Sequence, residues 1–318
     1  MHKIISEIIN SLNNKITNSK VDISKECFIK INKTDSNKKI AFIDGGNAEL
    51  LKANNFSLQI IRIFGLIFQN NKKISSIKNE FFLLAYSKKK EDKIIYQTEI
   101  FQIKGNKLIN EQDLILDSFD ETVKEGINRA EISKIGDIAR RFAELSFASN
   151  IKLDQDDILI LDGNLRTTYK NESNYLKKLK NNNIFVCALA KTSQIFNNAS
   201  CLFGDLADFN INYPWYFKIE NNKYAVKLNK TGKYVFEFET FSQNINEILS
   251  SLINNCNDAV FPGYPYGLIL ADKFARITNQ EKEYLINLFK VKAGKNWNKI
   301  EKYLNSTNAH SILDKISF

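Results

Sequence analysis

Two apolar runs of this chain end in the same pair of residues, an aspartate followed by a glycine. The first run, KIAFIDG, covers residues 39–45, and the second, DDILILDG, covers residues 156–163. Short apolar runs rich in β-branched residues predict buried strands, here ending at Asp44 and Asp162. An Asp-Gly pair after a strand is ordinary turn chemistry. Its repetition raises the question of whether the fold brings the two acids together.

The order of the other segments predicts how these strands are arranged. Three further strand segments follow the first run, at residues 57–68, 79–86 and 93–103, and a helical period covers about 119–150. The second run is then followed by a short helix and by the strand 184–190. Short connections between the early strands predict an antiparallel meander, whereas strand–helix–strand units predict parallel neighbours.

The predicted fold class is therefore α/β, with a ribonuclease-H-like mixed sheet flanked by helices. Additional helices are expected at the N-terminus, over about 2–19, and near the C-terminus, over about 243–254, 265–276 and 279–304. No linker interrupts the chain, so residues 1–318 are expected to form a single domain with a core over about 39–277.

In this topology the strands ending at Asp44 and Asp162 are parallel neighbours. Their carboxyl ends lie at one edge of the sheet, so the two acids would project side by side. Two close carboxylates repel each other unless their charge is compensated. A divalent cation compensates it through hard oxygen ligands and leaves positions for water and phosphate. Gly45 and Gly163 would let the chain turn sharply after each acid and let a substrate come close.

The helix before the second Asp-Gly pair offers two further acids, Glu131 and Glu144. From the rise per residue of strands and helices, the level of Asp162 falls between them, somewhat nearer to Glu144. Glu131 shares the apolar stripe of the helix, whereas Glu144 lies opposite it, four residues after Arg140. An ordinary surface ion pair would form at that spacing. The choice between the two acids stays open on this reasoning.

Two later segments carry polar residues that the fold could bring to the same edge. ALAKTS places Lys191 at the end of the next core strand, where its charge could hold a phosphate. FPGYPYGLILADKFARIT places Asp272 on a late helix, where an acid could complete the site. The ordinary alternatives are a surface lysine and an acid paired with Arg276 one helical turn further on.

Composition narrows the classes of function. The net charge of +9 suits an anionic partner such as nucleic acid. Only two histidines are present, and the four cysteines show no C-x-x-C spacing, which disfavours a histidine-centred site, the usual zinc site and a disulfide framework. No stretch approaches the roughly 20 apolar residues of a membrane span, and the first segment is typical of an amphipathic helix rather than a signal peptide. A cytoplasmic protein is expected.

Five segments, in the same order, resemble the NurA family of nucleases: FIDGGN, RRFAEL, LILDGNL, ALAKTS and GYPYGLILADKFARI. The resemblance covers about residues 39–277. It implies a ribonuclease-H-like core, a homodimer, and cleavage of DNA that depends on Mn²⁺, with Mg²⁺ as the other candidate ion. It also implies 5′–3′ exonuclease and single-strand endonuclease activity in DNA end resection, together with a hexameric ATPase of the HerA type.

The resemblance also implies roles for particular residues. Asp44, Glu144 and Asp162 are the metal ligands that it indicates, so it favours Glu144 over Glu131, and Tyr264 of the Gly-Tyr-Pro segment belongs to the site. Asp272 stands where many members have a histidine; an acid there can still ligate metal or activate water. The first motif reads Asp-Gly-Gly where the family usually has Asp-Gly-Ser.

The DNA-binding candidates are Lys191, Arg140 and Arg166. The hypothesis that follows is phosphodiester hydrolysis with two cations, bridged by Asp44 and held on their outer sides by the other acids. An actin-like or sugar-kinase-like ATPase is one alternative, but the glycine-rich phosphate loops that it needs are missing from this glycine-poor sequence. A catalytically silent subunit that only binds DNA or the ATPase is another, and it would not need so many acids.

Overall fold

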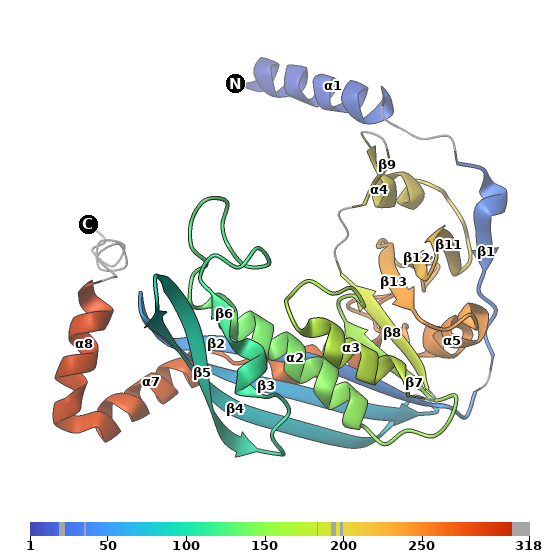
Figure 1. The fold of residues 1–318 in the computed structure, drawn as a ribbon. Coiled ribbons are helices and arrows are strands. Elements are labelled where there is room, and N and C mark those ends of the chain that lie inside the picture. Colours follow the sequence, from blue (N-terminus) through green and yellow to red (C-terminus); the bar gives the residue numbers. More distant parts are fainter. Residues whose placement is uncertain (19–22, 35, 183, 192–194, 198–199, 307–318) are drawn as a thin grey trace.

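Among the described residues, one sheet of 11 strands runs through the protein, a second sheet has two strands, and helices cover both faces of the large sheet (Figure 1). The structure is a computed structural model that describes residues 1–318 except 19–22, 35, 183, 192–194, 198–199 and 307–318. Within the described residues, no helix is both long enough and apolar enough to cross a membrane.

The strands have the following bounds: β1 Phe28–Lys30, β2 Lys39–Ala53, β3 Phe56–Gln69, β4 Lys72–Lys90, β5 Lys93–Lys104, β6 Leu116–Asp117, β7 Ile158–Asp162, β8 Phe185–Ala190, β9 Phe196–Asn197, β10 Ser200–Cys201, β11 Trp215–Glu220, β12 Lys223–Lys227 and β13 Phe236–Thr240. The α-helices have these bounds: α1 His2–Asn18, α2 Lys134–Asn150, α3 Glu172–Lys180, α4 Leu202–Ala207, α5 Ile245–Leu252, α6 Tyr266–Ala275, α7 Asn279–Ala293 and α8 Trp297–Ser306.

The sheet has the mixed topology that the sequence predicts. Its strand order is β1-β11-β12-β13-β8-β7-β2-β3-β4-β5-β6. Strands β2 to β5 form an antiparallel meander, whereas β7 runs parallel to β2, and β8 runs parallel to β7. The predicted α/β class and the ribonuclease-H-like core are thereby confirmed.

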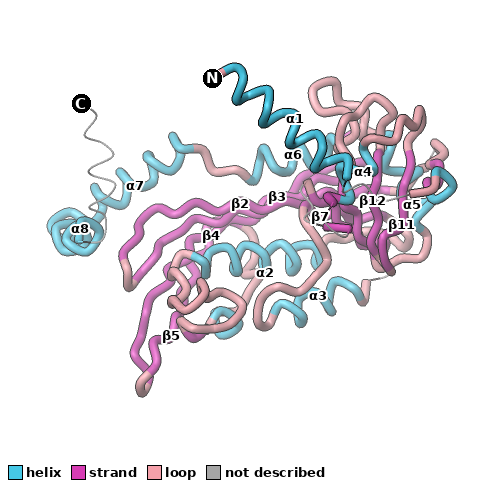
Figure 2. Tube along the Cα trace, turned by 90° about the horizontal axis from the view of Figure 1, so that it is seen from above, coloured by secondary structure: helices cyan, strands magenta, loops and turns pink. Residues whose placement is uncertain are grey.

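The alternation of side chains along β2 sets which helix meets which face. Ala41 and Ile43 pack in the core beneath α2 and α3, whereas Ile40 and Phe42 pack in the core formed with α5 and α6. Figure 2 shows α6 on one side of β2 and β3, with α2 and α3 on the other. Because successive side chains of a strand point to opposite faces, Asp44 follows Phe42 onto the α6 side.

The first Asp-Gly pair does not end a strand, contrary to the prediction. Strand β2 continues from Asp44 through both glycines to Ala53, because β3 pairs with it along its whole length, with Gly45 opposite Ile63. Only the second pair turns the chain: Gly163 has a φ of 113°, a conformation that favours glycine. The glycine at 45 must therefore have a different role.

The helix expected over 119–150 begins only at Lys134. Polar side chains hold the preceding segment in turns: the Asp117 and Asp120 carboxylates accept hydrogen bonds from the backbone N–H groups of Phe119 and Thr122. Such side-chain bonds compete with helix formation. The helix expected over 279–304 is also interrupted, after Ala293.

Helix α6 lies very close to the sheet because it presents a glycine to β2. A Cβ built at Gly267 would overlap the ring of Phe42, which is fully buried. Gly267→Ala should therefore lower the free energy of unfolding by about 1–3 kcal/mol, the usual cost of overpacking a core. Urea denaturation measures this cost. Gly204→Ala is the control, since its Cβ would meet nothing closer than 3.8 Å, and equal losses in the two variants would contradict the prediction.

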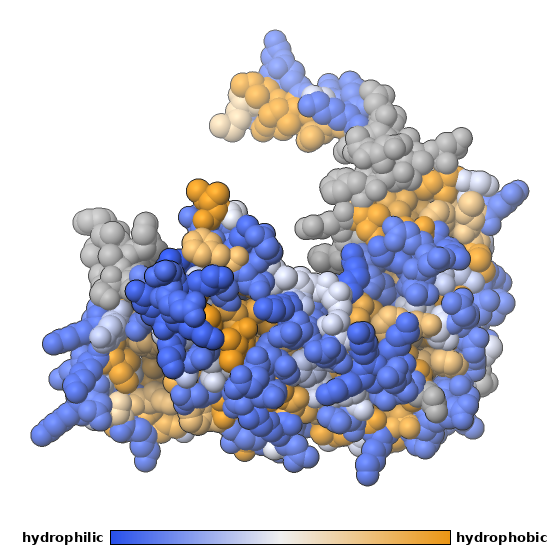
Figure 3. Space-filling model, in the orientation of Figure 1, coloured by the Kyte–Doolittle hydropathy of each residue, from blue (hydrophilic) through white to orange (hydrophobic). Residues whose placement is uncertain are grey.

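Helix α1 leaves the body of the protein with its apolar face uncovered (Figures 1 and 3). The side chains of Ile4, Ile8 and Leu12 on this face are 53–60% exposed. In Figure 3 they form a hydrophobic band along a helix that is otherwise hydrophilic.

Candidate metal centre

Three aspartates from distant parts of the chain meet where strand β7 ends. Ile43 of β2 is paired with Leu161 of β7, so the residues that follow them, Asp44 and Asp162, lie next to each other. Helix α6 brings Asp272 to the same place. One carboxylate oxygen from each aspartate lies within 4.8 Å of the others.

Glu144 approaches this point from the opposite face of the sheet, on α2. It is 3% exposed, and a Cβ built at Gly45 would overlap its carboxylate and lie 2.9 Å from its Cγ. The absence of a side chain at position 45 therefore makes room for Glu144 beside Asp44. Arg140 Nη1 donates to Glu144 Oε1 at 2.5 Å, so the predicted i,i+4 pair exists, but its acid is buried rather than on the surface.

Glu131 lies elsewhere. It precedes α2 in an exposed turn and pairs with Lys52 Nζ at 2.7 Å, near the far end of β2. Lys52 follows Asp44 by eight residues of strand, a distance of roughly 25 Å. The structure thus brings Asp44, Asp162 and Asp272 together, places Glu144 across β2 from them at Gly45, and leaves Glu131 out.

Three further predicted residues surround the aspartates. Lys191 Nζ lies 2.6 Å from Asp162 Oδ2 and 3.3 Å from Asp272 Oδ1. Tyr264 is completely buried, and its hydroxyl donates to Asp162 Oδ1 at 3.2 Å. Burial and the nearby acids raise the pKa of Tyr264, so the hydroxyl keeps its proton. Arg276 Nη2 donates to Asp272 Oδ2 at 2.6 Å, so Asp272 has its helical partner as well as its place among the acids.

Arg166 is engaged with the sheet rather than with the aspartates. It pairs with the buried Glu237 and, at 2.9 Å, with Glu239, both on β13. About half of its side chain remains exposed. Arg140, the other candidate DNA contact, donates to Glu144.

The charge balance of this cluster fits a divalent cation. Burial, together with the nearby carboxylates of Asp162 and Glu144, raises the pKa of Asp44 to about 8, against the effect of Lys191. Burial also raises the pKa of Glu144, although Arg140 opposes the shift. Such shifts mark acids whose negative charge is incompletely compensated. Several hard oxygen atoms within reach of one point are the ligands that Mn²⁺ and Mg²⁺ take.

The raised pKa of Asp44 predicts how stability depends on pH when no metal is present. Between the ordinary value of 3.8 and the folded value of about 8, the folded protein holds a proton that the unfolded chain has released. Stability should therefore fall as pH rises through this window. In EDTA, Asp44→Asn should recover more than about 1 kcal/mol at pH 8.5 and little at pH 4, since one unit of pKa difference corresponds to about 1.4 kcal/mol. Parallel pH profiles of unfolding for the two proteins would contradict this expectation.

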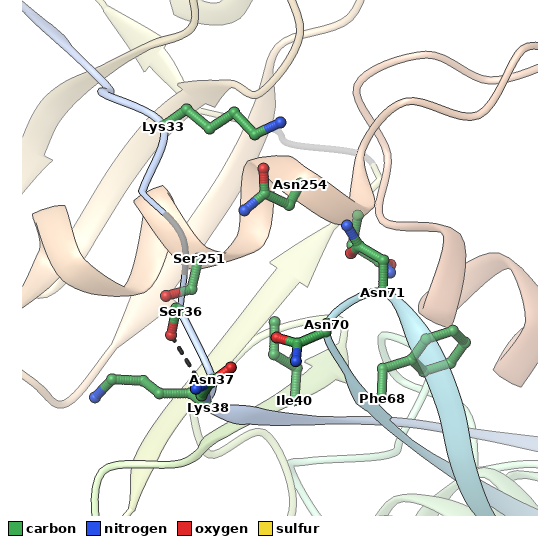
Figure 4. A pocket seen from close by; sticks show the side chains of 11 residues that line it. Lys33, Ser36, Asn37, Lys38, Ile40, Phe68, Asn70, Asn71, Ser251 and Asn254 are labelled. Atoms are coloured by element: carbon green, nitrogen blue, oxygen red, sulfur yellow. Dashed lines mark hydrogen bonds between the residues drawn. The ribbon is translucent and has the colours of Figure 1, made fainter.

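A separate pocket lies toward the start of β2, on the α5 side of the sheet (Figure 4). Its volume is about 410 Å³, and Ile40 and Phe68 contribute apolar walls. Amide side chains, including Asn70, Asn71 and Asn254, surround it. No acid is found among the described residues that line it, so this pocket offers no carboxylate ligands, and the aspartate cluster remains the candidate site.

One residue that supports the site was not predicted. Arg62 of β3 is 8% exposed, and its Nη1 donates to the carbonyl of Arg276 at 3.1 Å, just beyond the end of α6. Its Nε donates to Glu80 at 2.5 Å. Arg62 thereby anchors the end of the helix that carries Asp272. An arginine and a glutamate within two otherwise apolar strand segments were the signal that could have revealed this anchor.

Comparisons with known proteins give the following similarities. The family model of the NurA domain matches residues 38–277. The crystal structure of the NurA nuclease from Sulfolobus solfataricus is similar over 93% of this chain and 98% of that one, with 14% identity and a TM-score of 0.54. Human endonuclease V aligns over 85% of this chain and 96% of its own, with 9% identity and a TM-score of 0.39. No curated protein sequence matches the chain.

Proposed function

Because this chain belongs to the NurA family, it is a nuclease, and we propose that it hydrolyses phosphodiester bonds of DNA with the help of bound Mn²⁺ or Mg²⁺. The observation that carries the proposal is the convergence of Asp44, Asp162 and Asp272 within 4.8 Å. Acids on two strands and a late helix would not gather in this way merely to end strands with turns.

The acidic residues of the site would hold the metal ion in this reaction. Asp44, Asp162 and Asp272 would hold the cation, with Glu144 reaching them past Gly45. When bound, the cation would help to activate water and would neutralise charge on the reacting phosphate.

The side chains around the acids would orient them and contact the substrate. Tyr264 fixes the orientation of Asp162 through its hydroxyl, and Arg140 fixes that of Glu144. Lys191 is 40% exposed at the edge of the cluster, where its ammonium group can reach a phosphate of the substrate.

Family membership supports the finer parts of the proposal. These are 5′–3′ exonuclease and single-strand endonuclease activity, a cytoplasmic homodimer, and action with a HerA-type ATPase in DNA end resection, as one step of homologous recombination and DNA repair. The net charge of +9 is favourable for contact with DNA. The ATPase alternative finds no support in the family match, and a silent subunit would not need the three gathered aspartates.

Cleavage of labelled single- and double-stranded DNA in Mn²⁺, Mg²⁺ or EDTA tests the function directly. We expect cleavage with either ion and none in EDTA. The label position, at the 5′ or the 3′ end, reports the polarity. Cleavage that persists in EDTA would contradict metal dependence, and hydrolysis of ATP without any cleavage would favour the ATPase alternative.

The two rival helix acids are separated by matched variants. Glu144→Gln should lower the cleavage rate by at least about 100-fold, because it removes a charge beside the reacting centre. Glu131→Gln should leave the rate within about twofold, since it loses only a surface ion pair. Steady-state cleavage rates at saturating Mn²⁺ measure both. The reverse order of effects would move the site toward Glu131.

A further inference from the structure

The ammonium group of Lys191 lies among the carboxylates that would hold a cation. Its Nζ contacts Asp162 Oδ2 at 2.6 Å and Asp272 Oδ1 at 3.3 Å, and it lies 5.5 Å from the centre of the Tyr264 ring. It is thus in direct contact with two of the three clustered aspartates, and its charge also acts on Asp44, the third.

The remaining carboxylate oxygens of these two aspartates already have hydrogen-bond donors. Tyr264 donates to Oδ1 of Asp162, and Arg276 donates to Oδ2 of Asp272. A divalent ion that bound Asp162 Oδ2 and Asp272 Oδ1 would compete with Lys191 for these two oxygens. Lys191 is the donor that contacts both aspartates. Its flexible stem and 40% exposure let its ammonium group move toward solvent without disturbing the core.

We infer that Lys191 is a resident counter-cation of the acid cluster, which a divalent ion displaces and which then becomes available to bind a phosphate of the DNA. This inference rests on the proposed function. Before the metal binds, the ammonium compensates the charge of the aspartates. After displacement, the same group lies at the edge of the site without its carboxylate partners, and a phosphate oxygen is its natural new partner.

This exchange couples the two binding events. The metal ion displaces Lys191 from the acids, so it should increase the affinity for DNA, and by thermodynamic reciprocity DNA should increase the affinity for the metal. An ammonium group that only repelled the metal, or only contacted DNA, would add nothing to this coupling. Lys191 would therefore couple the binding of the metal to the binding of DNA.

The experiment compares Lys191→Met with wild type and with Lys170→Met, which removes the same charge from an exposed position in the loop after β7. Binding of Mn²⁺ is measured by calorimetry without DNA. We expect Lys191→Met to bind Mn²⁺ about tenfold more tightly than wild type, because it loses a competing cation. In EDTA the same variant should melt at a lower temperature than wild type, and saturating Mn²⁺ should abolish this difference.

Binding of a labelled DNA oligonucleotide is measured in Ca²⁺, at Ca²⁺ concentrations at which the oligonucleotide is not cleaved. Wild type and Lys170→Met should bind the oligonucleotide more tightly with Ca²⁺ than in EDTA, and Lys191→Met should lose most of this gain. Lys191→Gln serves as a second variant if the methionine variant fails to fold, and Lys191→Arg, which keeps the charge, should bind Mn²⁺ no more tightly than wild type.

The outcomes separate this inference from the proposed function. Equal Mn²⁺ affinities for wild type and Lys191→Met would overturn the inference while leaving a metal site in place. Weaker binding in the variant would overturn it too, because it would make Lys191 a supporter of the metal. A wild-type protein that binds no Mn²⁺ at all would overturn both.

Discussion

Replacing Asp44 by asparagine should abolish DNA cleavage while the protein remains folded. Asp44 is the acid at the centre of the cluster: it lies beside Asp162 and next to the residue that gives Glu144 its space. Losing a ligand of a catalytic metal removes several kcal/mol of transition-state stabilisation, so we expect a loss of at least about 1,000-fold in the cleavage rate. Single-turnover cleavage of labelled DNA in Mn²⁺ measures this loss.

Two controls make the result specific. Asp92→Asn removes the same charge from the exposed β4–β5 turn and should leave the rate unchanged. DNA binding by Asp44→Asn in EDTA should stay near that of wild type, since a cluster of acids does not itself attract phosphates. Cleavage by Asp44→Asn at the wild-type rate would show that the reacting centre lies elsewhere.

Adding a single methyl group at position 45 should damage the site without removing any acid. A Cβ at Gly45 would overlap the Glu144 carboxylate and come within 2.8 Å of Ile63. The backbone of β2 at this position is ordinary strand, so alanine brings no conformational strain of its own. Displacement of a catalytic group by about 1 Å can cost about 100-fold in rate, and we expect a loss of that order for Gly45→Ala.

A double-mutant cycle tests whether this loss acts through Glu144. In a Glu144→Ala background, the added methyl group no longer meets a carboxylate, and the remaining contact is with the flexible end of the Ile63 side chain, so it should lower the rate by no more than about threefold. Cleavage rates of the four proteins, with far-ultraviolet circular dichroism to verify the fold, complete the cycle. A full 100-fold loss in both backgrounds would mean that Gly45→Ala disrupts the sheet rather than Glu144.

The pairing of Asp44 with Asp162 could be predicted because it follows from topology. In the ribonuclease-H-like order of elements, the first strand of the meander and the strand after α2 are parallel neighbours, and each acid follows a residue of the pair Ile40–Ile158 by four positions, which places the acids at one level. The apolar content of each run predicts the strands without knowledge of their partners. The strands β2 and β7 are therefore encoded by local sequence, and their pairing follows from the order of the elements.

Other features depend on contacts that no local pattern reveals. The chain does not turn at Gly45, because β3 pairs with β2 far beyond Asp44, and the length of that pairing is a tertiary property. Helical periodicity could not locate the start of α2, because aspartate side chains that bind backbone N–H groups set it. Helix geometry could separate Glu131 from Glu144 only when that start was known, whereas the family resemblance already favoured Glu144.

The glycines of the first motif illustrate the same limit. Gly45 and Gly46 are consecutive, so their missing side chains face opposite sides of the sheet. A Cβ at Gly45 would meet Glu144, and a Cβ at Gly46 would overlap the backbone carbonyl of Ala275 at the end of α6. The second glycine, which stands where a serine is usual, thus matches a close approach of α6, the helix that carries Asp272.

A crystal structure with Mn²⁺, solved with anomalous scattering recorded at the manganese edge, tests the central claim most directly. The account predicts an anomalous peak about 2.0–2.6 Å from carboxylate oxygens of both Asp44 and Asp162. Lys191 Nζ should then have left its position between Asp162 and Asp272. A protein whose manganese lies elsewhere, with no peak beside this pair of aspartates, would contradict it.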